Sequence, residues 1–277
     1  MSLFLASLNS GSNGNCYYIG NDDEAVLIDV GICCRETEKR MKRLGLDISR
    51  VKAIFVSHEH SDHISGIQVL SAKYRLPVYI TNETLNNSRL TIDKDLTIPF
   101  AANEPVVIGG LIVNAFRKCH DACDPHSFTV SFNNINVGVF TDIGKACEEV
   151  IHHFKKCDAA ILEANYDVTM LACGNYPYYL KKRISGGNGH LSNEEALHLF
   201  TKYRPASMTH LVLSHLSKNN NCPILVRQLF SKYAGKTAII VASRYEETAV
   251  FEIRGKYSAI KPRKIIVKNR HLQLSMF

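Results

Sequence analysis

The chain has 277 residues, of which 45% are hydrophobic and 21% are charged, the balance of an ordinary globular protein. This composition excludes a disordered chain, a collagen-like fibre and a coiled coil, and no apolar run approaches the roughly 20 residues of a membrane-spanning helix. The formal net charge of +7 lies at one end, because seven basic residues and no acidic residue follow Glu252. Residues 253–277 therefore form a basic segment that suits an anionic partner such as nucleic acid or only keeps the chain soluble.

The N-terminal residues 1–6 lack the basic start and the apolar stretch of a secretory signal, so we expect a cytoplasmic protein with no membrane association. The nine cysteines, an odd number, are then expected to be reduced thiols. Cys119 and Cys123 do not indicate a structural zinc finger, because a second pair of ligands is missing.

In chain order, short β-rich runs alternate with helical stretches, which predicts one α/β domain over residues 1–277. In the first half we expect strands at 16–19, 25–29, 53–56 and 78–80, the first two as a hairpin, and helices at 32–44 and 64–74. In the second half we expect strands at 106–108, 111–116, 128–132, 135–140, 159–162 and 211–213, and helices at 146–154 and after Ser192. Ser192 and Glu195 form a capping box that fixes where this last helix begins.

The densest chemical signal directly follows the apolar strand at 53–56. The segment Ser57-His58-Glu59-His60-Ser61-Asp62-His63 contains three imidazoles and two carboxylates, which are costly to bury without partners. A loop at the end of a strand can turn His58 and His60 to one side and Asp62 and His63 to the other. This arrangement favours two metal ions that lie close together. The alternative is a polar surface loop that is rich in histidine.

The order His58-x-His60-x-Asp62-His63 resembles the signature of the metallo-β-lactamase superfamily. The resemblance continues at Asp29, His120, Asp142 and His215, each of which follows a predicted strand. It implies a four-layer αββα sandwich with both metal ions at one edge, between the two sheets. It also implies the role of each ligand: His58, His60 and His120 for one ion, Asp62, His63 and His215 for the other, Asp142 for both, and Asp29 as a support behind the metal loop.

Some of these positions have an alternative interpretation. His120 alone could be a core histidine, Asp142 could cap a turn or a helix, and His210 competes with His215 for the last ligand position. We favour His215, because it lies just past the apolar strand, where the other ligands also lie.

The ligand set, five imidazoles and two carboxylates, suits zinc and also admits manganese. Two such ions lie about 3.5–4 Å apart with a hydroxide between them, which Asp62 would also orient. We therefore expect metal-dependent hydrolysis.

Three further segments bear on the substrate. The turn at residues 9–15 has small polar side chains, Ser12, Asn13 and Asn15, which either cradle a phosphate or belong to an ordinary connecting turn. Glu163 or Asn165 follows a strand and reaches the same edge. His190 precedes the capped helix, where it either protonates a leaving group, contacts phosphate or packs as a loop histidine.

The basic run Lys181, Lys182 and Arg183 either holds a nucleic-acid backbone or forms a solvated face.

Taken together, four short segments resemble the YycJ (WalJ)-like branch of the superfamily, and the match covers nearly the whole chain. They are Gly11-Ser12-Asn13-Gly14-Asn15, Thr141-Asp142-Ile143-Gly144, Leu162-Glu163-Ala164-Asn165-Tyr166 and Gly189-His190-Leu191-Ser192-Asn193. The resemblance implies hydrolysis of phosphodiester bonds in DNA, with 5′-to-3′ exonuclease activity and a role in DNA repair. The stretch between Asp142 and His215 is too short for a β-CASP insert, which disfavours an activity like that of ribonuclease J.

Two alternatives stay open. The first is a hydrolase of small esters, thioesters, lactones or cyclic phosphodiesters on the same fold. The second is a non-catalytic DNA-binding or regulatory module, against which the complete ligand set argues.

The last five residues suggest a protein partner. Gln273, Leu274, Ser275, Met276 and Phe277 are similar to the pentapeptide with which bacterial replication and repair proteins bind the DNA sliding clamp. The apolar anchors could fill a groove while Gln273 sets the register. The alternative is an apolar terminus that packs on the domain's own surface.

Overall fold

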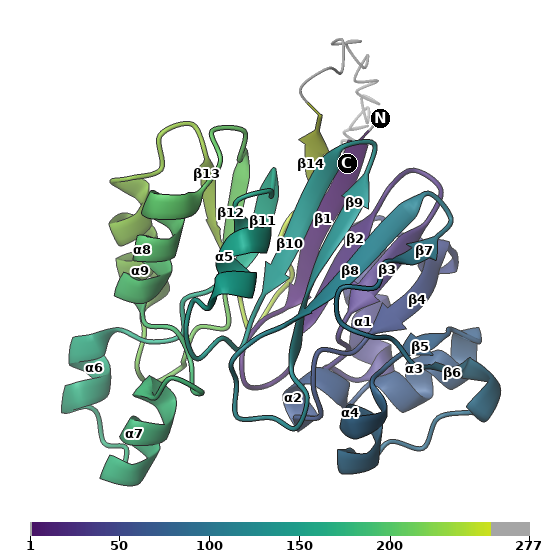
Figure 1. Ribbon diagram of the computed structural model, residues 1–277, viewed down its shortest axis with the longest axis horizontal. Coiled ribbons are helices and arrows are strands. Elements are labelled where there is room, and N and C mark those ends of the chain that lie inside the picture. Colours follow the sequence, from purple (N-terminus) through teal and green to yellow (C-terminus); the bar gives the residue numbers. More distant parts are fainter. Residues whose placement is uncertain (1, 256–277) are drawn as a thin grey trace, which may run out of the picture.

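Two seven-stranded sheets pack against each other in the computed structural model, which describes residues 2–255 (Figure 1). The first sheet has the order β14-β1-β2-β3-β4-β5-β6. Its strands are β1 (Ser2–Asn9), β2 (Cys16–Gly20), β3 (Ala25–Ile28), β4 (Val51–Phe55), β5 (Val78–Tyr79), β6 (Thr97–Ile98) and β14 (Phe251–Arg254). The predicted hairpin is confirmed, because β2 and β3 pair antiparallel.

The second sheet has the order β13-β12-β11-β10-β9-β8-β7. Its strands are β7 (Val106–Ile108), β8 (Leu111–Arg117), β9 (His126–Phe132), β10 (Ile135–Phe140), β11 (Ala159–Glu163), β12 (His210–Ser214) and β13 (Ala238–Val241). In each sheet, a block of antiparallel strands is followed along the chain by a block of parallel strands. The parallel strands are β3 to β6 in the first sheet and β10 to β13 in the second.

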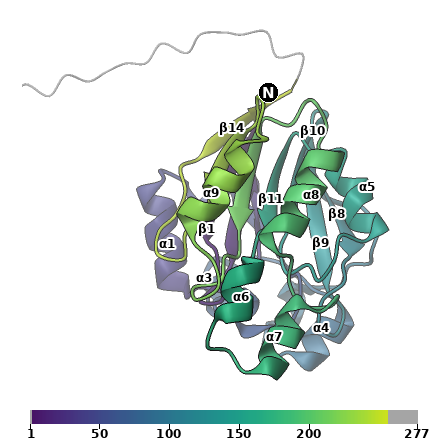
Figure 2. The same cartoon turned by 90° about the vertical axis from the view of Figure 1, so that its left-hand side faces the viewer.

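Helices cover the outer face of each sheet, so the molecule has four layers (Figures 1 and 2). The helices beside the first sheet are α1 (Cys34–Arg43), α2 (Ser61–Ile64), α3 (Ile67–Tyr74) and α4 (Asn82–Asn87). The second sheet is covered by α5 (Glu148–Phe154), α8 (Asn193–Tyr203) and α9 (Pro223–Ser231). Two short helices, α6 (Val168–Cys173) and α7 (Tyr178–Ser185), lie beyond the strand ends.

The core between the sheets follows from the two-residue period of the strands. In β1, Leu3 and Leu5 face the second sheet, whereas Ala6 and Leu8 face the helices. Each sheet also packs against its helices through an apolar layer on its outer face. Met41 of α1 lies in the layer on the first sheet, and Phe200 of α8 lies in the layer on the second. The predicted αββα sandwich is therefore confirmed.

The expected elements differ from the structure in two ways. The helix expected at 64–74 is divided into α2 and α3, because the Gly66 amide donates to the Val30 carbonyl there. A side chain at Gly66 would collide with the carbonyl oxygen of Ile32, 2.0 Å away. Four strands, β1, β6, β13 and β14, and four helices, α4, α6, α7 and α9, have no predicted counterpart; the strands lie at or next to the ends of the sheets.

The capping box of α8 forms as expected, with Ser192 and Glu195 each bonding to the other's backbone. No helix in the described part of the chain is both long and apolar enough to span a bilayer. The basic segment begins inside β14, and the rest of it, with the proposed clamp-binding residues 273–277, lies outside the described residues.

Candidate metal centre

The site is built at the carboxyl ends of strands. Asp29 follows β3, Asp142 follows β10, and His215 follows β12, and the parallel pairing of the strands brings these ends to one edge. These three residues have positive φ angles of 58°, 54° and 53°, a conformation that non-glycine residues seldom adopt. Such backbone strain is typical of functional sites, where the surrounding structure holds it in place.

All seven predicted ligands come together at this edge. One group, hereafter the first group, is His58, His60 and His120, whose ligand atoms all lie within 4.8 Å of one another. The second group is Asp62, His63 and His215, whose ligand atoms also lie within 4.8 Å of one another.

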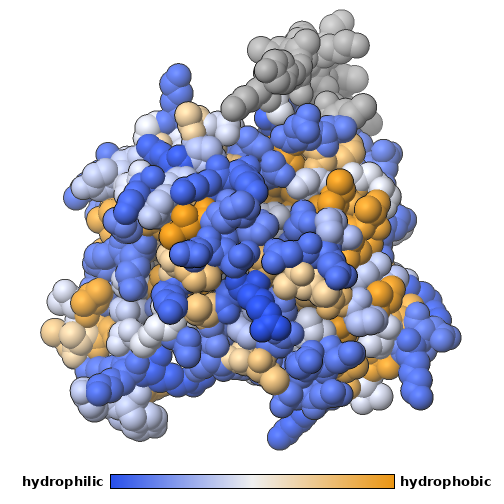
Figure 3. Space-filling model, viewed as in Figure 1, coloured by the Kyte–Doolittle hydropathy of each residue, from blue (hydrophilic) through white to orange (hydrophobic). Residues whose placement is uncertain are grey.

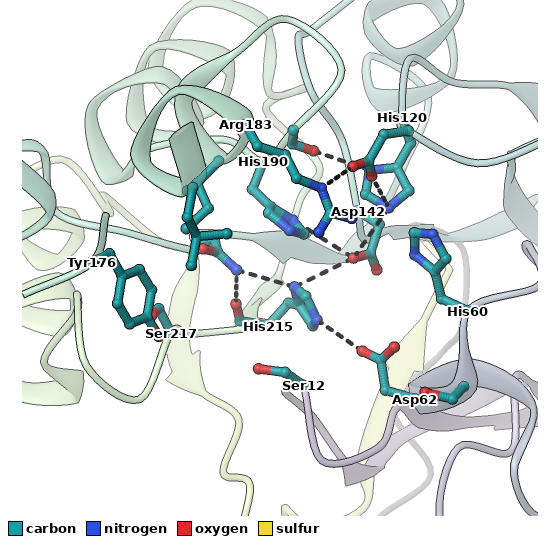
Figure 4. A pocket seen from close by; sticks show the side chains of 16 residues that line it. Ser12, His60, Asp62, His120, Asp142, Tyr176, Arg183, His190, His215 and Ser217 are labelled. Carbon is teal, nitrogen blue, oxygen red and sulfur yellow. Dashed lines mark hydrogen bonds and ion pairs between the residues drawn. The ribbon is translucent and has the colours of Figure 1, made fainter. Parts of the chain in front are cut away.

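Asp142 lies between the two groups (Figure 4). Its Oδ2 is 3.0 Å from Nε2 of His63, and its Oδ1 is 3.8 Å from Nε2 of His120 and 3.5 Å from Nδ1 of His215. His210, the competitor of His215, is at the opposite end of β12, and its ring packs near Phe251. Asp142 therefore lies within 4 Å of histidines from both groups, the place expected for a bridging carboxylate.

The histidines of the second group are oriented by carboxylates. His63 Nδ1 donates to Asp29 Oδ2 at 2.7 Å, and His215 Nδ1 donates to Glu163 Oε1 at 3.0 Å. Because a carboxylate can only accept, each Nδ1 carries a proton and Nε2 is the nitrogen that faces the site; Nε2 of His63 also lies 3.0 Å from the side-chain amide nitrogen of Asn15.

Neutral oxygens orient two histidines of the first group. His120 Nδ1 donates to the Gly189 carbonyl at 3.0 Å. Ser57 Oγ donates to Asp29 at 2.7 Å, so it accepts from His58 Nδ1 at 2.8 Å. In both rings Nδ1 makes the supporting hydrogen bond, which leaves Nε2 to face the site.

These residues fit divalent metal ions. Within the described residues, the buried Nε2 atoms of His120 and His215 have no hydrogen-bond partner, an arrangement that is costly unless a cation accepts their lone pairs. The remaining donors are further imidazoles and carboxylates, the ligands that zinc and manganese take.

Electrostatics distinguish the two groups. Burial disfavours a charged His63, but Asp142, Asp29 and Asp62 outweigh burial and raise its pKa to about 10. In the first group burial dominates and lowers the pKa of His120 to about 4, and it lowers the pKa of His58 well below its usual value. The field of the buried carboxylates therefore stabilises positive charge chiefly in the second group.

Glu163 completes the support of the site from beneath. Its buried Oε1 accepts from Nδ1 of His190 at 2.8 Å and from His215, and its Oε2 accepts from the amide of Ile143 at 2.7 Å. Burial raises the pKa of the Glu163 carboxyl, but the two histidines prevail and lower it to about 2. One oxygen of Glu163 also lies within 4.8 Å of a carboxylate oxygen of Asp142, but both oxygens of Glu163 already accept hydrogen bonds from these donors.

Two supporting residues did not stand out in the sequence. Ser57 joins Asp29 to His58, and its signal is its place between a buried strand and the histidine motif. Lys118 is buried two residues before His120, and its ammonium donates to the Thr141 carbonyl at 2.7 Å, beside Asp142. A lone basic residue after a strand gives no sequence signal for such a role.

Only some of the residues expected to bind substrate line the pocket. Ser12 and Asn165 line the pocket above the ligands. Asn15 is buried behind the metal loop, where its amide donates to Asp62 Oδ2 at 3.3 Å, and the Asn165 amide donates to the His215 carbonyl at 2.8 Å. Asn13 is exposed outside this pocket, and its amide donates to the Arg244 carbonyl.

The pocket has a volume of about 360 Å³ and opens over both ligand groups. His190 lies at its wall with 21% of its side chain exposed, and Arg183 reaches it from α7 while paired with Asp121 (Figure 4). Lys181 and Lys182 do not line it; Lys181 donates to the Ala172 carbonyl at 2.6 Å.

Comparisons with known proteins agree with this geometry. A model of the metallo-beta-lactamase superfamily matches residues 10–114. The exodeoxyribonuclease YycJ of Bacillus anthracis is 34% identical over 249 residues, which cover 89% of this chain and 94% of that protein. The chain belongs to the metallo-β-lactamase superfamily, in its YycJ (WalJ) branch.

Two further comparisons agree, one with the family and one with the fold. The exodeoxyribonuclease WalJ of Streptococcus pneumoniae is 30% identical over 219 residues, covering 77% of this chain and 81% of that protein. The crystal structure of the metallo-beta-lactamase fold protein YhfI from Bacillus subtilis superposes with a TM-score of 0.70 at 17% identity. The superposition covers 91% of this chain and all of the YhfI chain, and it supports the fold alone.

Membership of the superfamily confirms both the predicted family and the predicted fold. The chain is a hydrolase of the metallo-β-lactamase fold whose histidine and aspartate clusters suit divalent metal ions.

Proposed function

We propose that this protein is an exodeoxyribonuclease that hydrolyses phosphodiester bonds at DNA ends with two divalent ions, zinc or manganese. The observation that carries the proposal is the convergence of seven ligands as two groups joined by Asp142. Relatives that match most of the chain carry the name exodeoxyribonuclease. The proposed direction is 5′ to 3′.

The first group would hold one ion, the second group the other, and Asp142 both. When bound, such a pair supplies Lewis-acid polarisation of a phosphoryl oxygen and activates water near neutral pH. The buried hydrogen bonds of His63 to Asp29 and of His215 to Glu163 keep these rings in place, so the site is preorganised.

Asp62 and His190 are the proposed catalytic residues. Asp62 faces the pocket from the start of α2, where its carboxylate would orient the attacking water. His190 donates from Nδ1 to Glu163, so the proton that would contact phosphate or pass to the leaving oxygen is a second one, on Nε2.

Ser12 and Arg183, at the pocket wall, are the proposed phosphate contacts. The pocket volume lies at the small end of the usual range for ligand sites, which suits the last nucleotide of a strand. For Asn15 and Asn165 we propose a role in positioning Asp62 and His215 in addition to any contact with substrate.

The decisive experiment is digestion of duplex DNA that is labelled at the 5′ or the 3′ end, with and without added Mn²⁺ or Zn²⁺. We expect metal-dependent release of nucleotides that begins at the 5′ label, is lost in Asp62→Ala and is retained in the control Asp22→Ala, at an exposed turn. Intact DNA with metal bound would favour the small-molecule hydrolase. Absence of both metal and activity would favour the binding module.

A sliding-clamp partner is a separate proposal that rests on the sequence Gln273–Phe277 alone. Deletion of these five residues is expected to abolish co-elution with the clamp and to leave DNA hydrolysis unchanged. Co-elution of the truncated chain would contradict it. The cytoplasmic location and the role in DNA repair stay predictions from the sequence.

A further inference from the structure

The helices α6 and α7, with the turn between them, form an arm at residues 168–185 that projects beyond the strand ends (Figures 1 and 2). Leu171 is the buried side chain of α6, and α7 has none. A helix without a buried face gains little from packing, so its composition is free to serve another purpose.

The arm combines exposed aromatic rings with positive charge. Tyr178 is 72% exposed and Tyr179 is 74% exposed. The Nζ atom of Lys182 lies 5.2 Å from the centre of the Tyr178 ring. No acidic residue occurs between residues 168 and 193, whereas three consecutive basic residues do. Figure 3 shows pale and orange side chains beside hydrophilic ones over this arm, at the lower left.

The arm is also joined to the pocket. Leu180 and Arg183 of α7 line the pocket, as does Tyr176, which comes just before the helix (Figure 4). Tyr179 precedes Arg183 by four residues, so the two side chains are neighbours on the helix surface. The amide of Asn219 donates to the Tyr176 hydroxyl at 3.2 Å and links the arm to the loop that follows β12.

We propose that Tyr178 and Tyr179, whose rings point to different sides of α7, provide two stacking faces (together the platform) for unpaired bases of the strand that enters the pocket. The inference rests on the proposed function and deepens it, since it specifies a single-stranded DNA end as the preferred substrate. Aromatic faces bind unpaired bases of any sequence, and neighbouring lysine and arginine side chains attract the phosphates. A paired base has its faces covered by its neighbours, so the platform selects unpaired ends.

The test compares Tyr178→Ala/Tyr179→Ala with Tyr178→Phe/Tyr179→Phe in the full-length, metal-loaded protein. Tyr233→Ala, at a half-exposed tyrosine after α9, is the matched control. Binding is measured by fluorescence anisotropy with a single-stranded phosphorothioate oligonucleotide, which resists hydrolysis, and with the same oligonucleotide carrying abasic sites. Hydrolysis is measured on DNA with an overhang and on bis(4-nitrophenyl) phosphate, which has no base.

We expect the alanine variant to lose about tenfold in affinity for the normal oligonucleotide and in kcat/KM for the overhang. The phenylalanine variant and Tyr233→Ala should match the wild type, as should hydrolysis of the small phosphodiester by all variants. Abasic sites should weaken binding to the wild type and leave binding to the alanine variant unchanged.

Wild-type affinity in the alanine variant would overturn the platform, and so would an equal loss for normal and abasic DNA. If wild-type protein binds the oligonucleotide through the tyrosines but degrades no DNA, the proposed function fails and the platform stands.

Discussion

The histidines of the two ligand groups have differently charged partners. In the second group, Asp29 and Glu163 accept from the outer nitrogens of His63 and His215. In the first group, a serine hydroxyl and a backbone carbonyl take that place for His58 and His120. A carboxylate makes an imidazole a more basic ligand, so we expect the second group to bind its ion more tightly.

The largest effect is expected where the two groups meet. Asp142→Ala removes the carboxylate that lies between both groups, so metal should be lost from both and activity should fall by more than about a hundredfold. Metal content by plasma mass spectrometry and DNA hydrolysis measure the two effects. Retention of one tightly bound ion with normal activity would show that the groups are independent of Asp142. Asp22→Ala serves again as the control.

The second prediction compares the partners directly. Asp29→Asn keeps the shape but removes the charge behind His63, and metal affinity should fall roughly 10- to 100-fold. Ser57→Ala removes a neutral partner of His58 and keeps the Ser57 amide bond to Asp29 Oδ1 at 2.8 Å, so the loss should be smaller. Competition with a coloured chelator gives both affinities. A larger loss in Ser57→Ala would reverse the ranking of the two groups.

The third prediction concerns the backbone beneath Asp62. A Cβ at Gly31 would lie 1.7 Å from the Asp62 carbonyl oxygen, so Gly31→Ala must displace the second group. We expect a loss of about 1–3 kcal/mol in the free energy of unfolding, together with reduced activity. In the control Gly187→Ala the added methyl would meet only Lys145 Cδ, at 3.9 Å. Chemical denaturation and DNA hydrolysis of the two variants should separate them clearly.

Much of this site could be predicted from the sequence, because its ligands follow apolar strands. The parallel strands β3 and β4 and their counterparts β10 to β12 are mostly apolar, and within each sheet the carboxyl ends of parallel strands meet at one edge. The motif at residues 57–63 and the carboxylate after β10 therefore indicated the metal centre before its geometry was known.

What the sequence could not predict depends on contacts between distant segments. β1 pairs with β14, some 250 residues away, and neither strand has a motif that indicates its partner. Asn15 was expected either to help cradle a phosphate or to belong to a connecting turn. Its side chain is buried against the metal loop, where its backbone amide donates to the Asp62 carbonyl, whereas Ser12 and Asn13 of the same turn are exposed. Composition does not reveal which side of a turn is covered.

The smallest predicted effect is on the stability of the metal-free protein across pH. His120 has a pKa of about 4 in the folded protein against 6.5 as a free side chain, so between these values the unfolded chain binds the extra proton. Stability should therefore fall as the pH drops from 6.5 to 4. His63 has a pKa of about 10, so the folded protein holds its proton from 6.5 upward and stability should fall as the pH rises to 10.

The thermal midpoint in EDTA should accordingly be highest near pH 6.5, with His120 contributing to the acid limb and His63 to the alkaline limb. His120→Gln should flatten the acid limb between pH 6.5 and 4, and His63→Gln should flatten the alkaline limb, because each removes a group whose titration contributes to that slope. Asp62, whose pKa burial raises but His63 and His215 lower to about 2, destabilises the fold only at more acidic pH. If His120→Gln changes the alkaline limb, or His63→Gln the acid limb, the difference in charge between the two ligand groups does not arise from the separate hydrogen-bond partners of their histidines.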